Sequence, residues 1–179
     1  AAFRHAGGTG NVWVRSVIPM GRGLGFSGAA RVAGVVLGHA QRNGKESLVA
    51  DRKELLRLST ELEGHPDNVA ASLVGGVTAS ASGEVVKLPL GFDPAFIAWV
   101  PDTQTSTEKS RTAIASSIPL SDVVFNIGHT ALLMAAFAAG DVAVLREATK
   151  DRMHQDVRFA ASPNSHEAFT AALATDAWC

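Results

Sequence analysis

The chain has 179 residues, of which 46% are hydrophobic and 18% are charged, with a formal net charge of −1 and one cysteine. This composition is typical of a globular protein with a substantial core, and it excludes a disordered or fibrous chain. The near-zero charge and the lack of dense Lys/Arg runs argue against nucleic acid as a partner. A single cysteine excludes an internal disulfide framework, and the start of the chain is not signal-like, so we expect a cytoplasmic protein.

The longest apolar run, Ala131 to Ala139, is too short to span a bilayer, so we expect no membrane segment. The chain begins at Ala1 without a methionine, and it stops at Cys179, where the pattern resembles the start of an apolar strand. We therefore expect it to be an internal fragment of a longer protein.

The first part of the chain predicts a strand, a glycine-rich loop and a buried helix. β-Branched residues in partial alternation from Asn11 to Ile18 predict a strand that ends at Pro19. Small and branched residues predict a helix from Ala29 to about Gln41, which Asn43-Gly44 closes.

A second helix is predicted to begin after Asp51. Asp51 is expected to act as its N-cap, with Glu54 as the capping-box partner. Its apolar stripe consists of Leu55, Leu58 and Leu62, and it stops at Gly64.

The remaining elements group strands together and helices together. Short apolar runs predict a helix through Leu73, a hairpin of 77–80 with 85–88, and a buried strand at 96–100. Helical spacing predicts three further helices at 122–139, 141–153 and 165–175. This grouping favours an α+β fold over a doubly wound sheet.

The glycine loop is the strongest functional signal. Gly23, Gly25 and Gly28 spell G-x-G-x-x-G before a helix, where backbone N–H groups and the helix dipole favour an anion. A plain glycine turn is one alternative. A dinucleotide fold is another, with Ser47 to Asp51 as its second strand, but the loop does not follow its strand directly. A P-loop is excluded because the lysine is missing.

The segment from Pro19 to Ala30 resembles the P-x-x-x-G-L-G-S-S-A-A loop of the GHMP small-molecule kinases. Glu63 to Ala70 is similar to the E-G-H-P-D-N-V-A segment of the homoserine kinase family within that superfamily. Later segments are similar in the same order, at 105–111, 125–128 and 151–155 with Arg158. The resemblance covers nearly the whole chain.

This resemblance implies an α+β GHMP kinase fold. Residues 1–88 would belong to an N-terminal ATP-binding lobe related to ribosomal protein S5 domain 2, and 89–179 to a ferredoxin-like C-terminal lobe. The implied reaction is ATP-dependent phosphorylation of the L-homoserine hydroxyl to O-phospho-L-homoserine in threonine biosynthesis. Relatives of this kind are commonly dimers, so a homodimer is expected.

The resemblance assigns a nucleotide cradle and a Mg²⁺ site. The cradle is the backbone of the loop, namely Pro19, Met20, Gly21, Arg22, Gly23, Leu24, Gly25, Phe26, Ser27, Gly28 and Ala29. The implied Mg²⁺ ligands are the Ser27 hydroxyl and one glutamate, for which we favour Glu63 over Glu61, and Thr107 is expected to assist. A solvated helix residue is the alternative for Glu61, and a turn hydroxyl for Thr107.

The same resemblance assigns the acceptor site. Arg111 and Arg158 would hold the substrate carboxylate, although arginines in surface ion pairs are the alternative. Asn68, with His65 nearby, would face the reacting hydroxyl. Asparagine cannot accept a proton, so direct in-line attack is implied, with Asn68 and Arg111 as the catalytic residues. Asp67 is expected to stabilise a turn or cap a helix rather than to act as a base.

Two departures from the family pattern leave other functions open. Phe26 replaces the first serine of the loop, and His129 stands where relatives often carry arginine. The alternatives are another GHMP kinase and a non-catalytic nucleotide- or metabolite-binding regulator of the same fold. The histidines and the cysteine show no transition-metal spacing.

Overall fold

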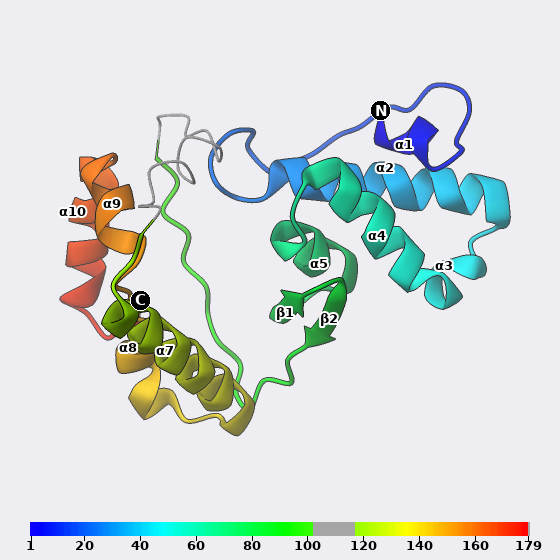
Figure 1. The fold of residues 1–179 in the computed structure, drawn as a ribbon. Coiled ribbons are helices and arrows are strands. Elements are labelled where there is room, and N and C mark those ends of the chain that lie inside the picture. The colour runs from blue at the N-terminus through cyan, green and yellow to red at the C-terminus, as the bar shows by residue number, and fades with distance from the viewer. Residues whose placement is uncertain (102–116, 179) are drawn as a thin grey trace. The chain divides into compact units, whose positions relative to one another are not determined.

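The computed structural model describes residues 1–101 and 117–178 (Figure 1). The chain divides into two compact units, Ala1–Leu88 and Pro89–Cys179. Each unit has its own buried residues, so each is described by itself.

The first unit consists of helices around a long central one, followed by a hairpin (Figure 1). Helix α2 contacts α1, α4 and α5, and α5 contacts β1. The elements are α1 (Ala2–His5), α2 (Phe26–Asn43), α3 (Ser47–Ala50), α4 (Arg52–Glu63), α5 (Asp67–Val74), β1 (Thr78–Ala81) and β2 (Glu84–Lys87).

The predicted helices of this unit are confirmed, and glycines set their ends. Helix α2 begins after Gly25 and ends at Gly44, and both glycines have positive φ, 71° and 84°. Gly64 closes α4 in the left-handed conformation, with φ of 86°. Because a residue with a β-carbon is strained at such angles, Gly44 and Gly64 end the helices where the sequence predicts, whereas α2 begins at Phe26, before the predicted start at Ala29.

The core of the first unit lies where α2, α4 and α5 meet. Val35, Leu55 and Val69 are almost fully buried there. Leu58 and Leu62 pack against the same core and are partly buried. The predicted leucine stripe of α4 therefore faces the core, as an amphipathic helix requires.

The predicted capping box at the start of α4 is wrong. Asp51 occupies the N-cap position, but no side-chain cap hydrogen bond forms there. The Asp51 carboxylate instead pairs with the His39 ring, and Glu54 pairs with Arg57. The Asp51 carboxylate therefore contacts His39 on α2 instead of the backbone N–H groups at the start of α4.

The predicted hairpin is confirmed. Thr78 pairs with Lys87 and Ala81 with Glu84 in antiparallel register. Ser82 and Gly83 both have positive φ, 50° and 82°, which is the requirement of a two-residue type I′ turn.

Three other strand interpretations fail. Residues 11–18 and 96–100 form no strand among the described residues, and Trp13, Val17 and Ile97 are largely exposed. Alternation alone is not enough, because a strand also needs a neighbour to pair with. Ser47–Ala50 is a helical turn, which removes the second strand of the dinucleotide-fold alternative.

The described residues of the second unit form helices only, so strands of a ferredoxin-like lobe are not among them. The elements are α7 (Leu120–Ala139), η1 (Val142–Val144), α8 (Leu145–Ala148), α9 (Gln155–Ala160) and α10 (Pro163–Leu173). The helix predicted at 141–153 is shorter and ends at Ala148. Asp151 ends this region because its carboxylate accepts the backbone N–H groups that lead into α9.

Helix α7 is long and apolar. It is the one helix of the described segments whose length and mean hydropathy (1.4) would suffice to cross a membrane. It extends beyond the run Ala131–Ala139 on which the expectation of no membrane segment rested. Asn126 and His129 on this helix make polar contacts with Asp151 and Glu147 of the same unit. Most of the helix is nevertheless exposed, since only 6% of its apolar window is buried and Leu120, Val124 and Ile127 are largely exposed.

Candidate active site

The glycine loop ends at an open helix N-terminus. Gly21, Gly23 and Gly25 all have positive φ, so the loop turns sharply before α2. No side-chain cap hydrogen bond forms at Gly25. The first N–H groups of an α-helix lack intrahelical partners, and they carry the positive end of the helix dipole. This geometry suits an anion such as a phosphate.

Asn68, the first residue after Asp67 on α5, lies directly against this loop. A β-carbon built on Gly28 would lie 2.9 Å from the Asn68 Cβ, and one on Gly25 would lie 3.4 Å from its Oδ1. The absence of a side chain at Gly28 therefore allows α5 to approach the start of α2, whereas a β-carbon on Gly25 would make an ordinary contact. A polar amide group stands beside the predicted phosphate site as a result.

Ser27 and Glu63 form the second feature of the site. The Ser27 hydroxyl donates to Oε2 of Glu63 over 3.0 Å, which joins the first turn of α2 to the end of α4. The Glu63 side chain is only 7% exposed. The Arg31 guanidinium contacts both the Ser27 hydroxyl and the Glu63 carboxylate. Two of the residues predicted to bind Mg²⁺, Ser27 and Glu63, are thus adjacent, although 36 positions separate them.

Glu61 faces elsewhere. Its carboxylate pairs with Arg57 on the solvent-exposed side of α4, and about half of its side chain is exposed. Arg57 also binds Glu54, and these hydrogen bonds lower the pKa of Glu54 and raise that of Arg57. Two residues apart on a helix, Glu61 and Glu63 point in different directions.

His65 and Asp67 arrange the turn before Asn68. The His65 ring contacts the Asp67 carboxylate at 2.5 Å, and the same oxygen accepts the Asn68 backbone N–H at 2.6 Å. His65 Nε2 lies 3.9 Å from the Glu63 carboxylate. Asp67 thus holds the start of α5, in agreement with the turn role expected for it.

In the second unit, the structure joins two of the segments that resemble the family. The Asn126 amide donates to Asp151, and its Oδ1 accepts the Arg152 backbone N–H at 2.9 Å. Burial opposes the ionised form of Asp151. Hydrogen bonds from the His154 and Gln155 backbones and the Asn126 side chain outweigh it and lower the pKa of the Asp151 carboxyl.

His129 lies beside this network. Its ring stacks on Phe125 at 3.6 Å, and its Nδ1 lies 2.8 Å from the Phe125 carbonyl, to which it must donate. Its Nε2 lies 3.3 Å from the Glu147 carboxylate. The Arg152 guanidinium lies over the Phe125 ring, 3.8 Å from its centroid. Phe125 is therefore flanked by His129 and Arg152.

The other predicted residues are less informative. Arg158 lies on α9 in the second unit and is exposed. Thr107 and Arg111 lie outside the described residues.

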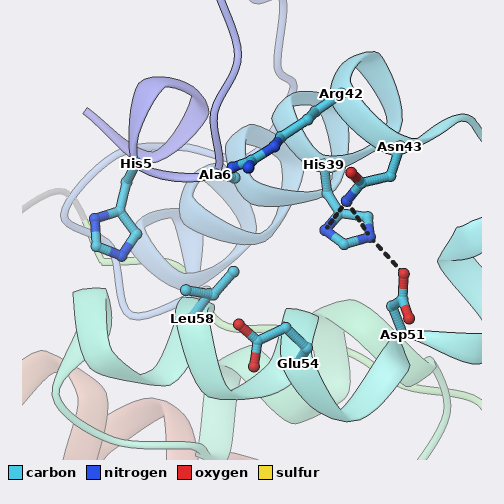
Figure 2. A pocket seen from close by; sticks show the side chains of 8 residues that line it. All are labelled: His5, Ala6, His39, Arg42, Asn43, Asp51, Glu54 and Leu58. Atoms are coloured by element: carbon cyan, nitrogen blue, oxygen red, sulfur yellow. Dashed lines mark hydrogen bonds and ion pairs between the residues drawn. The ribbon is translucent and has the colours of Figure 1, made fainter.

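A separate cavity of about 400 Å³ lies at the far end of α2, away from the glycine loop (Figure 2). Its polar side chains already contact neighbours, since His39 meets Asp51 at 2.8 Å and Asn43 at 3.1 Å. Its lining residues are His5, Ala6, His39, Arg42, Asn43, Asp51, Glu54 and Leu58. Sequence reasoning missed it, because its polar groups come from three helices with no shared motif.

Comparison with known proteins connects this geometry to a family. Residues 1–76 match the family model of the GHMP kinase N-terminal domain. A homoserine kinase of Clostridium botulinum (strain 657 / Type Ba4) is 43% identical over 149 residues, covering 81% of this chain and 49% of the relative. Residues 1–76 therefore form a GHMP kinase N-terminal domain.

Further relatives carry the same name. The chain is 38% identical to a homoserine kinase of Gloeobacter violaceus, over 98% of the chain and 60% of the relative. The crystal structure of homoserine kinase from Cytophaga hutchinsonii has a TM-score of 0.75 and 30% identity, covering 88% of this chain and 52% of that one. The GHMP kinase fold is thus confirmed. The chain spans about half the length of the curated relatives it matches.

Proposed function

We propose that the protein is a homoserine kinase, which transfers the γ-phosphoryl group of ATP to the hydroxyl of L-homoserine. The observation that carries this proposal is the placement of Asn68 against Gly25 and Gly28, on either side of Ser27, whose hydroxyl contacts Glu63. An anion cradle, a pair of metal-binding oxygens and a neutral amide at one place are the parts that phosphoryl transfer needs. The choice of L-homoserine as substrate comes from the homoserine kinases among its relatives.

The donor set fits Mg²⁺. Mg²⁺ takes oxygen ligands in a near-octahedral arrangement with bonds of about 2.1 Å, so adjacent ligand oxygens lie about 3.0 Å apart. The Ser27 hydroxyl and the Glu63 carboxylate are 3.0 Å apart. When bound, the metal would neutralise phosphate charge. Thr107 is proposed to assist these two ligands, and Glu61 is not needed.

Asn68 is proposed to orient the attacking hydroxyl, with His65 nearby. Its amide cannot remove a proton, so the rate must come from alignment and from charge stabilisation by the loop N–H groups. Arg111 and Arg158 are proposed to hold the substrate carboxylate through paired N–H donors. In these roles the positively charged arginines face the negatively charged carboxylate of the substrate.

The wider assignments belong to the same proposal. Residues 1–88 would be part of the ATP-binding lobe and 89–179 part of the C-terminal lobe, a division that the two compact units support. We propose a cytoplasmic enzyme of threonine biosynthesis that acts on small molecules, not on nucleic acid or membranes, and that forms a homodimer.

A coupled ADP-release assay on the full-length protein tests the function. We expect turnover with L-homoserine and little with mevalonate or galactose. Turnover with another small alcohol instead would indicate a different GHMP kinase. Tight ATP binding with no turnover would favour a non-catalytic regulator, which the departure at Phe26 keeps open.

A further inference from the structure

Arg31 lies one helical turn after Ser27 on α2 and reaches toward α4. Its guanidinium contacts the Ser27 hydroxyl and the Glu63 carboxylate together. The Arg31 side chain is 37% exposed, whereas that of Glu63 is 7% exposed. A positive charge from the chain itself therefore stands at the oxygen pair proposed to bind the metal.

Arginine and a divalent cation compete for this position. Two cations beside one largely buried carboxylate repel each other, and one must move. Arg31 has a long, partly exposed side chain, which allows it to leave Glu63.

We propose that Arg31 is a resident cation of the Ser27–Glu63 pair, which holds the pair together without metal and leaves Glu63 when a divalent cation binds. The inference rests on the proposed function. Because Arg31 lies on the second turn of α2, its guanidinium stays near the open N–H groups of the helix when it moves. There its charge attracts the nucleotide phosphates. Arg31 is thus a positioning residue.

A purely structural role for Arg31 predicts a different result. If the guanidinium only tied α2 to α4, its removal would loosen the site and weaken both metal and nucleotide binding. A resident cation predicts effects of opposite sign, because its removal frees Glu63 for metal but takes a charge away from the phosphates.

The test measures Mn²⁺ binding to the full-length protein by electron paramagnetic resonance, without nucleotide. We expect Arg31→Gln and Arg31→Met to bind Mn²⁺ about tenfold more tightly than wild type, since a competing charge is gone. Arg31→Lys should stay within about threefold of wild type, because it keeps the charge. Arg57→Gln is the matched control: Arg57 pairs with Glu54 and Glu61, so no change is expected.

The second readout is ATP binding at a Mn²⁺ concentration that saturates wild type and variants alike, since Arg31 has then left Glu63. Under this condition Arg31→Gln and Arg31→Met should bind ATP about tenfold more weakly than wild type. Circular dichroism checks that the variants are folded, and two variants of different polarity guard against a local packing defect in either one.

Unchanged or weaker Mn²⁺ binding in both folded Arg31 variants would overturn the inference. Intact Mn²⁺ binding in Glu63→Gln would also overturn the inference, because the metal would then lie elsewhere. Homoserine turnover is measured separately. Tighter Mn²⁺ binding in the Arg31 variants without wild-type turnover on homoserine would overturn the proposed function and support the role of Arg31.

Discussion

Gly28 of α2 and Asn68 of α5 are packed so closely that a methyl group on Gly28 would lie 2.9 Å from the Asn68 Cβ. Gly28 is buried within the first turn of α2. This contact joins the helix that forms the anion cradle to the helix that carries the proposed hydroxyl-orienting amide. The distance between cradle and amide therefore depends on a missing side chain.

Gly28→Ala should move Asn68 and weaken the protein. Alanine usually stabilises a helix by about 1 kcal/mol relative to glycine, but overpacking costs about 1–3 kcal/mol. We expect a net loss of about 1 kcal/mol in the free energy of unfolding, measured by urea denaturation, together with a lower kcat. The control is Gly128→Ala in α7, where an added β-carbon would meet no atom within 4 Å among the described residues. This variant should have a higher free energy of unfolding than wild type. Equal gains for both variants would contradict the close contact.

Asn68→Ala should lower kcat with homoserine about a hundredfold or more, with the ATP KM changed little, because one preorganised polar contact is worth about that much. Steady-state kinetics at saturating ATP measure both constants. Asp67→Asn is the comparison, since it keeps an oxygen for the His65 and Asn68 contacts. A loss of about a hundredfold or more in Asp67→Asn would identify Asp67 as a general base and contradict our assignment.

Glu63→Gln should raise the Mg²⁺ concentration needed for half-maximal rate at least about tenfold, because a carboxylate ligand is lost. Glu61→Gln is its matched partner, two residues earlier on the same helix and already paired with Arg57. We expect Glu61→Gln to leave the Mg²⁺ dependence unchanged. The reverse pattern in a Mg²⁺ titration would assign the metal to Glu61.

Ser59→Ala should stabilise the protein. Ser59 on α4 is fully buried, and its hydroxyl has no hydrogen-bond partner among the described residues. Removing an unsatisfied buried hydroxyl recovers about 1 kcal/mol of desolvation cost. Ser72→Ala on the exposed side of α5 gives the gain from helix propensity alone. In chemical denaturation, a gain for Ser59→Ala no larger than for Ser72→Ala would show that the hydroxyl is satisfied.

Asp151→Asn should change how stability depends on pH. The pKa of Asp151 is lower in the folded state than in the unfolded chain. The carboxylate therefore contributes stability above its unfolded pKa of about 3.9, and this contribution is lost as pH falls through the folded value. At pH 7 we expect Asp151→Asn to cost about 1–3 kcal/mol, as for hydrogen bonds to a charged group.

The measurement for Asp151 is thermal or urea unfolding at several pH values between 7 and 3. The difference between wild type and Asp151→Asn should shrink as the solution becomes more acidic. Glu167→Gln, at an exposed position of α10, controls for the loss of one negative charge. A difference that stays constant down to pH 3 would contradict a lowered pKa for Asp151.

The sequence by itself determined the features whose causes are local. The C-terminal ends of α2 and α4 follow from Gly44 and Gly64, and the hairpin turn follows from Ser82-Gly83, because positive φ is a property of single residues. The motifs around Ser27 and Glu63 indicated the family, since their order and spacing are readable without coordinates.

Tertiary structure alone decided which side chains meet. Asp51 contacts His39 instead of capping its own helix, and Arg31 of α2 contacts Glu63 of α4, and no spacing in the chain predicts either contact. Residues 11–18 alternate like a strand but have no ladder to join among the described residues. Backbone conformation depends largely on neighbours in sequence, whereas hydrogen bonds and ion pairs of side chains depend on neighbours in space.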